Sequence, residues 1–415
     1  MPPRKNARKN AFAAAAVGGG DHIGSLPDGV LQHMLSFLPA QDAVRTCVLA
    51  KRWRHMWKST TVLRFVCGGM NEPKSMKEIQ DFVDQLLRLR ICGGTPLDTC
   101  EFRLGKYDEF DMSRMVLWIR IALQCKVQVL QLICLGNHPG IGSLDGHPFF
   151  ISQYLKKLEL NGIYFGMDDR FLDFSCCPVL EDLEIVDCYL GYALLISSQS
   201  LKRLTIEIGD FGDDDRLPIC APNLVSLWLE VSDGRIPSLE RMPSLLVPYV
   251  KIDTDFDCNF NSDSDDDEGD DNNQSILLQG LSEVRNLVLI SCYLEMFIFR
   301  RDLRFCSSFN KLKSLLVDEY WCQPADFSAL ACLLKLSPVL EKLTLQLYSK
   351  GPKHKVEIKL SCKPMEISAE ISRHFKTLEV KCEVYDERIS NVLTFLSEKL
   401  NILWFQLYEW KCLDL

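Results

Sequence analysis

The chain has 415 residues, of which 47% are apolar and 25% are charged, and its formal net charge is −9. This length supports two or three domains or one long repeat array. The negative charge argues against nucleic acid or an anionic membrane as the main partner. No apolar run reaches the roughly 18 residues that a membrane-spanning helix needs, so we expect no membrane span.

Residues 1–20 are predicted to form a disordered tail with basic residues, alanines and glycines. The apolar part of this tail is too short and too rich in alanine for a secretory signal peptide. An organellar transit peptide does not fit either, because a folded pattern begins almost at once. Nuclear import through the basic residues stays open as a minority hypothesis.

Residues 21–62 contain three short apolar helical patterns with start and stop signals. The first pattern follows Leu26-Pro27 and stops at Pro39, the second spans 43–48, and the third carries two tryptophans. A unit this small buries too little apolar surface to be stable alone. Its remaining apolar face therefore needs the rest of the chain or a partner.

The segment LPDGVLQHMLSFLPAQDAVRTCVLAKRWRHMW resembles the F-box of plant proteins. The resemblance implies docking on a Skp-type adaptor, which carries an F-box protein into a cullin-based ubiquitin ligase. It assigns adaptor binding to these residues: Leu26, Pro27, Val30, Leu31, Leu35, Leu38, Pro39, Val44, Val48, Leu49 and Trp53. One departure is Ala50, where many relatives have Ser. If this position caps the third helix, the missing hydroxyl costs about 0.5–2 kcal/mol. The alternative is an ordinary three-helix cap for the following domain.

Beyond the F-box one pattern recurs: an apolar residue, two others, an apolar residue, one other, and an apolar residue. We assign residues 63–350 to the repeat region. Clear copies begin at Leu155, Leu180, Leu201 and Leu224, which are 21 to 25 residues apart. Further copies begin at Val247, Val284, Leu312, Leu340 and Phe375, with weaker ones at Leu97, Val127 and Leu400. So loose a triplet also arises by chance in an apolar chain. The spacing of about 20–29 residues is what indicates leucine-rich repeats.

Each repeat is expected to form one short strand with inward leucines, so that stacked neighbours build a core that no single repeat could form. The pattern resembles the irregular leucine-rich repeats of plant F-box proteins. The expected fold class is α/β: a small three-helix F-box, then an irregular leucine-rich-repeat solenoid, then a C-terminal cap.

Residues 253–273 form an acidic run inside the repeat region and are predicted to be a disordered loop, because dense like charges stay solvated. A tolerated insertion is the simpler interpretation, since long surface loops cost little entropy. The other interpretation is a phosphorylated or basic-partner-binding loop, because Ser262 and Ser264 precede acidic residues.

Residues 351–415 are predicted to contain a strand, a helix and a strand. They resemble the FBD module that closes many plant F-box repeat proteins, although residues 359–372 depart from it. A polar-faced terminal unit is what an open stack of repeats needs as a cap.

The residues that carry chemistry form no catalytic constellation. The 7 histidines have no metal-ligand spacing, and residues 140–146 are glycine-rich but lack the lysine of a phosphate loop. The 18 cysteines contain no C-x-x-C pair and lie partly in apolar runs, which suits free thiols in the cytoplasm or nucleus. We expect a non-catalytic protein without metal or cofactor.

Between the inward residues of each repeat, one side chain should face outward on the exposed sheet. This central column is predicted to hold Glu101, Gln131, Glu159, Glu184, Thr205, Trp228, Lys251, Val288, Leu316, Thr344, Glu379 and Trp404. Its middle carries Trp228, Val288 and Leu316, with Tyr249 and Ile290 in flanking columns. Target binding is therefore assigned to Trp228, Tyr249, Val288, Ile290 and Leu316. The alternative is that loops cover these residues, or that a register slip makes them core.

The resemblance and the repeats together predict the substrate-recognition subunit of a Skp–cullin–F-box ubiquitin ligase. The F-box would bind the Skp-type adaptor and through it the cullin, while the repeats would hold a target protein. The alternative is a scaffold that binds the adaptor without delivering a target for ubiquitination. An enzyme in its own right ranks third.

Overall fold

The computed structural model describes residues 23, 25–67, 76–105, 112–135, 150–165, 172–191, 193, 195–212, 216–253, 277–291, 303, 306–322, 327–347, 374–382, 387–400 and 406–409. The N-terminal tail, the glycine-rich segment 140–146, the acidic run from 254 onward and residues 359–372 lie outside these ranges. The predictions made for those four segments therefore stay predictions.

Four short helices form the N-terminal unit: α1 (Asp28–Leu35), α2 (Ala40–Arg45), and the 3-10 helices η1 (Thr46–Val48) and η2 (Lys51–Ser59). Pro27 and Pro39 are the N-cap residues of α1 and α2. Proline suits a helix start because its missing N–H would have no intrahelical partner there. Ala50 is the N-cap of η2 and makes no side-chain capping bond.

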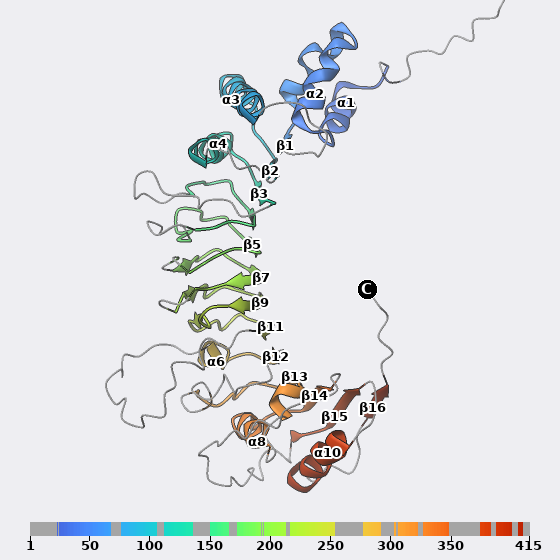
Figure 1. The fold of residues 1–415 in the computed structure, drawn as a ribbon, viewed down its shortest axis with the longest axis vertical. Coiled ribbons are helices and arrows are strands. Elements are labelled where there is room, and N and C mark those ends of the chain that lie inside the picture. Colours follow the sequence, from blue (N-terminus) through green and yellow to red (C-terminus); the bar gives the residue numbers. More distant parts are fainter. Residues whose placement is uncertain are drawn as a thin grey trace, which may run out of the picture.

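One sheet of 13 parallel strands dominates the rest of the chain, and its spatial order follows the sequence (Figure 1). The strands are β1 (Val62–Cys67), β2 (Thr99–Leu104), β3 (Val129–Cys134), β4 (Lys157–Asn161), β5 (Asp182–Val186), β7 (Arg203–Asp210), β9 (Ser226–Asp233), β11 (Val247–Ile252), β12 (Asn286–Ser291), β13 (Ser314–Asp318), β14 (Lys342–Leu347), β15 (Thr377–Cys382) and β16 (Gln406–Glu409). A second sheet joins three short parallel strands: β6 (Ile196–Ser197), β8 (Pro218–Cys220) and β10 (Ser238–Leu239). When each strand pairs with the next along the chain, the units are stacked as repeats.

Helices of different lengths accompany the strands. They are α3 (Met76–Gly93), α4 (Met112–Gln124), α6 (Leu277–Gly280), η3 (Glu319–Cys322), α8 (Ser328–Lys335) and α10 (Glu387–Leu400). Trp118 of α4 stacks on Phe102 of β2 and donates its Nε1–H to Asp84 of α3. Thus α3 and α4 cover one face of the first strands. Neither these two helices nor β1 was predicted from the sequence. Among the described helices, none is long and apolar enough to cross a membrane.

The strands bury alternate residues, as a half-covered sheet requires. In β3, for example, Leu130, Leu132 and Cys134 are buried while the residues between them are only half-buried. The buried side chains form one continuous core that runs from Leu31 and Trp53 of the N-terminal helices into the sheet. The residues between the buried ones form the opposite face of the sheet.

Glycine fixes the turns that follow some of these strands. Gly212 and Gly234 have φ values of 64° and 78°, in the left-handed region. A Cβ built on Gly234 would lie 2.3 Å from the backbone nitrogen of Gly212. Successive turns therefore stack backbone on backbone, which only glycine permits.

The predicted register of the exposed face is wrong at one strand. Trp228 of β9 pairs with Tyr249 of β11, which in turn pairs with Val288 of β12. Tyr249 therefore occupies the central column, and Lys251 lies in the flanking column beside Ile290. A proline, Pro248, occupies the inward position opposite Leu227, and this hid the correct copy of the apolar pattern. A slip of two residues keeps the same face outward.

The C-terminal part has the predicted order of strand, helix and strand, in β15, α10 and β16. The rings of Phe327 and Phe395 lie 4.9 Å apart and tie α10 to the start of α8. At the end of the column β16 pairs through Gln406 with Glu379, while Trp404 lies outside the described residues.

Candidate functional sites

The N-terminal helices expose an apolar surface that the rest of the described chain does not cover. Val48 and Leu49, at the turn between η1 and η2, are 82% and 70% exposed. Phe37, after α1, is 61% exposed. Four further apolar side chains of the same unit are exposed: Ile23, Val30, Met34 and Leu38. We call this set the apolar helix surface. Exposed apolar side chains in such density mark a protein-binding surface.

Several residues assigned to adaptor binding are buried or partly buried in the chain itself, and their contact with an adaptor stays a prediction. Leu31, Leu35 and Trp53 are 0%, 2% and 8% exposed. Leu26 and Val44 are partly buried against the same core. Leu31, Leu35 and Trp53 have almost no exposed surface in the chain by itself and hold the apolar helix surface in shape, whereas Leu26 and Val44 keep some exposed surface. Of the others, Pro27 is exposed and Pro39 half-buried.

Sequence reasoning missed Phe37 and left Met34 out of the binding set. Met34 and Phe37 widen the apolar stripe that α1 and the turn after it display, so that the stripe has more apolar residues than the core can bury. Apolar residues in excess of a buried stripe are a sequence signal for a binding surface. An ion pair fixes the helix start that presents them: Arg52 of η2 donates through Nε to Oδ1 of Asp28, at 2.8 Å.

The second candidate site is the exposed face of the sheet. Its central column is in register from Arg64 to Glu379 across the strands β1 to β15. The first half of the column is charged, and its charged side chains form ion pairs with neighbours on the same face. Glu101 pairs with Arg103 at 2.9 Å and with Arg64 at 3.5 Å, and Lys157 pairs with Glu184 at 2.8 Å.

The middle of the column is an apolar strip made of Trp228, Tyr249, Val288 and Leu316, one from each of four adjacent strands. The rings of Trp228 and Tyr249 stack with centroids 3.8 Å apart and planes 13° apart. Trp228 is 40% exposed, and the other three are half-buried. Strand spacing of about 4.7–4.9 Å makes the strip about 14 Å long. Thr205 and Thr344 end it on either side.

Two more residues border this strip. Ile290, which was assigned to target binding, is half-buried on the same face in the flanking column. Val247 is 52% exposed beside Tyr249, although the sequence pattern placed it inward as the start of a repeat. The same two-residue slip in β11 explains why Val247 was missed.

The remaining reactive groups of the described residues are structural in character. Burial raises the pKa of Cys134 and Cys188 to about 12 each and that of Cys177 to about 11, so these thiols are poor nucleophiles. The described cysteines form no disulfide. Among the described residues, no group of three or more His, Cys, Asp or Glu side chains is arranged to hold a metal. His33 and His55 are exposed on the N-terminal helices.

Comparison with known proteins identifies residues 23–65 as an F-box domain. The chain is 28% identical over 380 residues to the F-box/FBD/LRR-repeat protein At5g22660 of Arabidopsis thaliana, covering 83% of this chain and 80% of that protein. It is 27% identical over 379 residues to the F-box/LRR-repeat protein At3g59200 of the same plant, covering 79% of this chain and 69% of that protein. Over most of its length the chain is similar to plant F-box/LRR-repeat proteins.

These similarities agree with the family predicted from the sequence, and the name of At5g22660 includes an FBD module. The apolar helix surface lies within the matched F-box domain, residues 23–65. The apolar strip lies on the exposed face of the repeat sheet, on the side opposite the inward leucines. The F-box domain implies in general that a Skp-type adaptor is bound.

Proposed function

We propose that this protein is the substrate-recruiting subunit of a Skp–cullin–F-box ubiquitin ligase. The observation that carries the proposal is the apolar helix surface, where Phe37, Val48 and Leu49 are exposed on the F-box. Apolar surface of this kind is stabilised by burial against a partner. The adaptor would bind there and link the chain to the cullin.

The repeat region, as a leucine-rich-repeat solenoid with an FBD-like cap, would hold a target protein at the apolar strip. Stacked aromatic rings with exposed surface support this role, because binding hot spots are enriched in Trp and Tyr. The ligase chemistry would belong to the partner proteins. This chain would contribute by holding the target close to the ubiquitin-loaded enzyme, which raises the effective concentration of the two.

A non-degradative scaffold is the alternative, and deletion of residues 23–65 separates the two. If the protein recruits targets for degradation, cells that express the deleted chain should accumulate its bound partners with slower turnover and less ubiquitin. Affinity purification of both chains with mass spectrometry identifies those partners. Turnover that is unchanged for every shared partner would favour the scaffold.

Trp228→Ala tests the apolar strip. The substitution removes the stack on Tyr249 and part of a half-covered side chain, so we expect a loss of about 1–2 kcal/mol in unfolding free energy. Capture of the target should weaken by about 2 kcal/mol or more if Trp228 is a hot spot. The matched control is Trp118→Ala, a fully buried residue, which should cost about 3–5 kcal/mol in stability. A thermal melt compares the loss of stability in the two variants. A loss in Trp228→Ala as large as that in Trp118→Ala would contradict the docking role.

We also propose that the protein works in the cytoplasm or the nucleus. Free thiols at Cys100, Cys134, Cys177 and Cys188, buried without disulfide bonds, support a reducing compartment. Microscopy of the full chain with a fluorescent tag tests this, and a signal confined to the secretory pathway would contradict it.

A further inference from the structure

The junction between the F-box and the repeats is short and fully bonded. Only Thr60 and Thr61 separate η2 from β1. The Thr61 carbonyl accepts hydrogen bonds from the amides of Asp98 and Thr99, at 2.7 and 3.2 Å. The Thr60 hydroxyl donates to the carbonyl of Trp57 at 2.9 Å. Both junction residues therefore take part in hydrogen bonds, and Thr61 is tied to the start of β2.

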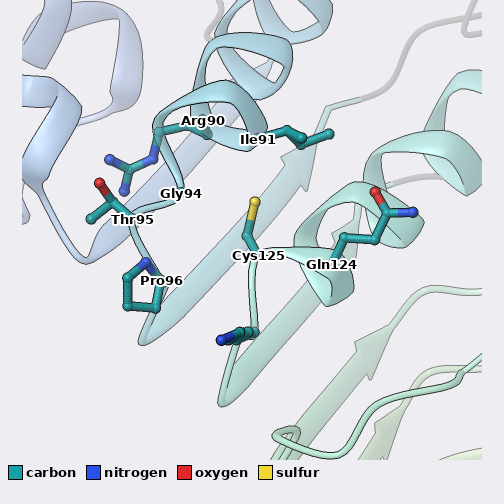
Figure 2. Close-up of a pocket in the computed structure, with 8 residues that line it drawn as sticks. Arg90, Ile91, Gly94, Thr95, Pro96, Gln124 and Cys125 are labelled. Carbon is teal, nitrogen blue, oxygen red and sulfur yellow. The ribbon is translucent and has the colours of Figure 1, made fainter.

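One side chain from the repeats reaches across this junction. Arg90, in the last turns of α3, donates through Nη1 to the carbonyl of Lys58 and through Nη2 to the carbonyl of Thr60. Figure 2 shows the side chain leaving α3 and pointing away from Cys125 and Gln124, which line the far side of the adjacent pocket. The carbonyls at a helix end lack intrahelical partners, so a cation there caps η2 favourably.

The burial of Arg90 makes this contact specific. Its side chain is 2% exposed, and taking a guanidinium out of water is costly unless its donors are matched. Burial lowers the pKa of Arg90 accordingly. An apolar residue would fill the same volume without that cost. Apolar packing is non-directional, however, whereas two hydrogen bonds from one planar group fix an angle between the elements they join.

We propose that Arg90 is the positioning residue that holds the F-box at one orientation relative to the repeat face. The inference rests on the proposed function, because orientation matters when the F-box carries an adaptor and the repeats carry a target. A fixed angle keeps the captured target within reach of the ubiquitin-loaded enzyme. A loose junction would spread the same target over a larger volume and lower its effective concentration.

The test measures the angle directly, in the full chain with and without a bound Skp-type adaptor. Spin labels on bio-orthogonal residues replace His55 of η2 and Arg285 before β12, two exposed positions, and pulsed dipolar spectroscopy gives their distance distribution. Arg90→Met keeps the side-chain length and removes both donors. Arg90→Lys keeps the charge but not the two-pronged geometry. Arg88→Met, on the exposed side of the same helix, is the matched control.

We expect a single narrow distribution in the wild type and in Arg88→Met, and at least a twofold broader one in Arg90→Met. Arg90→Lys should lie between them, and it decides the question if Arg90→Met does not fold. A distribution as narrow as the wild type in the folded Arg90 variants would overturn the proposal. Co-purification of each variant with the adaptor is measured separately. A wild-type chain that does not bind the adaptor would count against the proposed function. The distance distributions measured without adaptor would still decide the role of Arg90.

Discussion

Replacing Val48 and Leu49 together with Asp is expected to abolish adaptor binding while leaving the chain folded. These two side chains are the most exposed large apolar residues of the F-box, at 82% and 70%, so they contribute little to the core. Full burial of an apolar side chain of this size contributes about 1.5–3 kcal/mol. Losing both and burying two carboxylates should weaken the complex by at least about 100-fold, or about 3 kcal/mol.

The measurement is a titration of the purified chain with a Skp-type adaptor, together with a thermal melt. The unfolding free energy should change by no more than about 0.5 kcal/mol. The matched control is Leu135→Asp with Ile151→Asp, a pair that is 51% and 56% exposed in the repeat region and should bind normally. A folded Val48/Leu49 variant that binds within twofold of the wild type would refute the assigned surface.

This variant is a cleaner probe than replacing Leu26 and Pro27 with Ala. Leu26 packs against the core and Pro27 caps α1. That double substitution should also reduce adaptor binding, but through loss of the helix start as well as of contact. Since two causes act at once, a reduced affinity would not identify the contact surface.

The strands were predictable because each repeat carries its own period-two signal. The inward triplet Leu155, Leu158 and Leu160, which begins just before β4, can be recognised without any other part of the chain. At β11 the signal failed, because Pro248 took an inward place and a neighbouring triplet matched the pattern equally well. Local patterns of this kind cannot decide between registers that differ by two residues, since both put the same face outward.

The binding surfaces were harder to predict because burial depends on long-range packing. In α1 both Val30 and Leu31 fit an apolar helical stripe, yet one is 44% exposed and the other 0%. The buried half of that stripe is set by η2, which brings Trp53 and Trp57 into the same core. The sequence marks the apolar residues but not the direction from which a later helix covers them.

Arg90 was missed for a related reason, although a signal existed. Val83, Leu86 and Leu87 form the buried stripe of α3, and Arg90 continues their spacing onto the same face. A charged residue on an apolar helix face indicates either a surface edge or a buried partner. The partners here are backbone carbonyls of Lys58 and Thr60, which no side-chain pattern displays.

The stability of the repeats beside the apolar strip should fall as pH rises, through Asp318 at the end of β13. This carboxyl is 9% exposed and accepts a hydrogen bond from the Ser291 amide at 2.8 Å. Burial raises its pKa from the ordinary 3.8 to about 7. A raised pKa in the folded state means that folding favours the protonated acid. The stabilisation is therefore complete below about pH 4 and is lost as pH rises through about 7.

Asp318→Asn removes this titration while keeping an acceptor for Ser291. At about pH 4 the variant and the wild type should unfold with similar free energies. At pH 8 the variant should be more stable by about 2–4 kcal/mol, as measured by urea unfolding at both pH values. Ser291→Ala is the matched control, since it keeps the amide donor and should retain the wild-type pH dependence. A variant that shows the same loss between about pH 4 and pH 8 as the wild type would contradict the buried-acid explanation. Because Leu316 lies two residues before Asp318 in β13, a weakened strand at high pH should also weaken target capture at the strip.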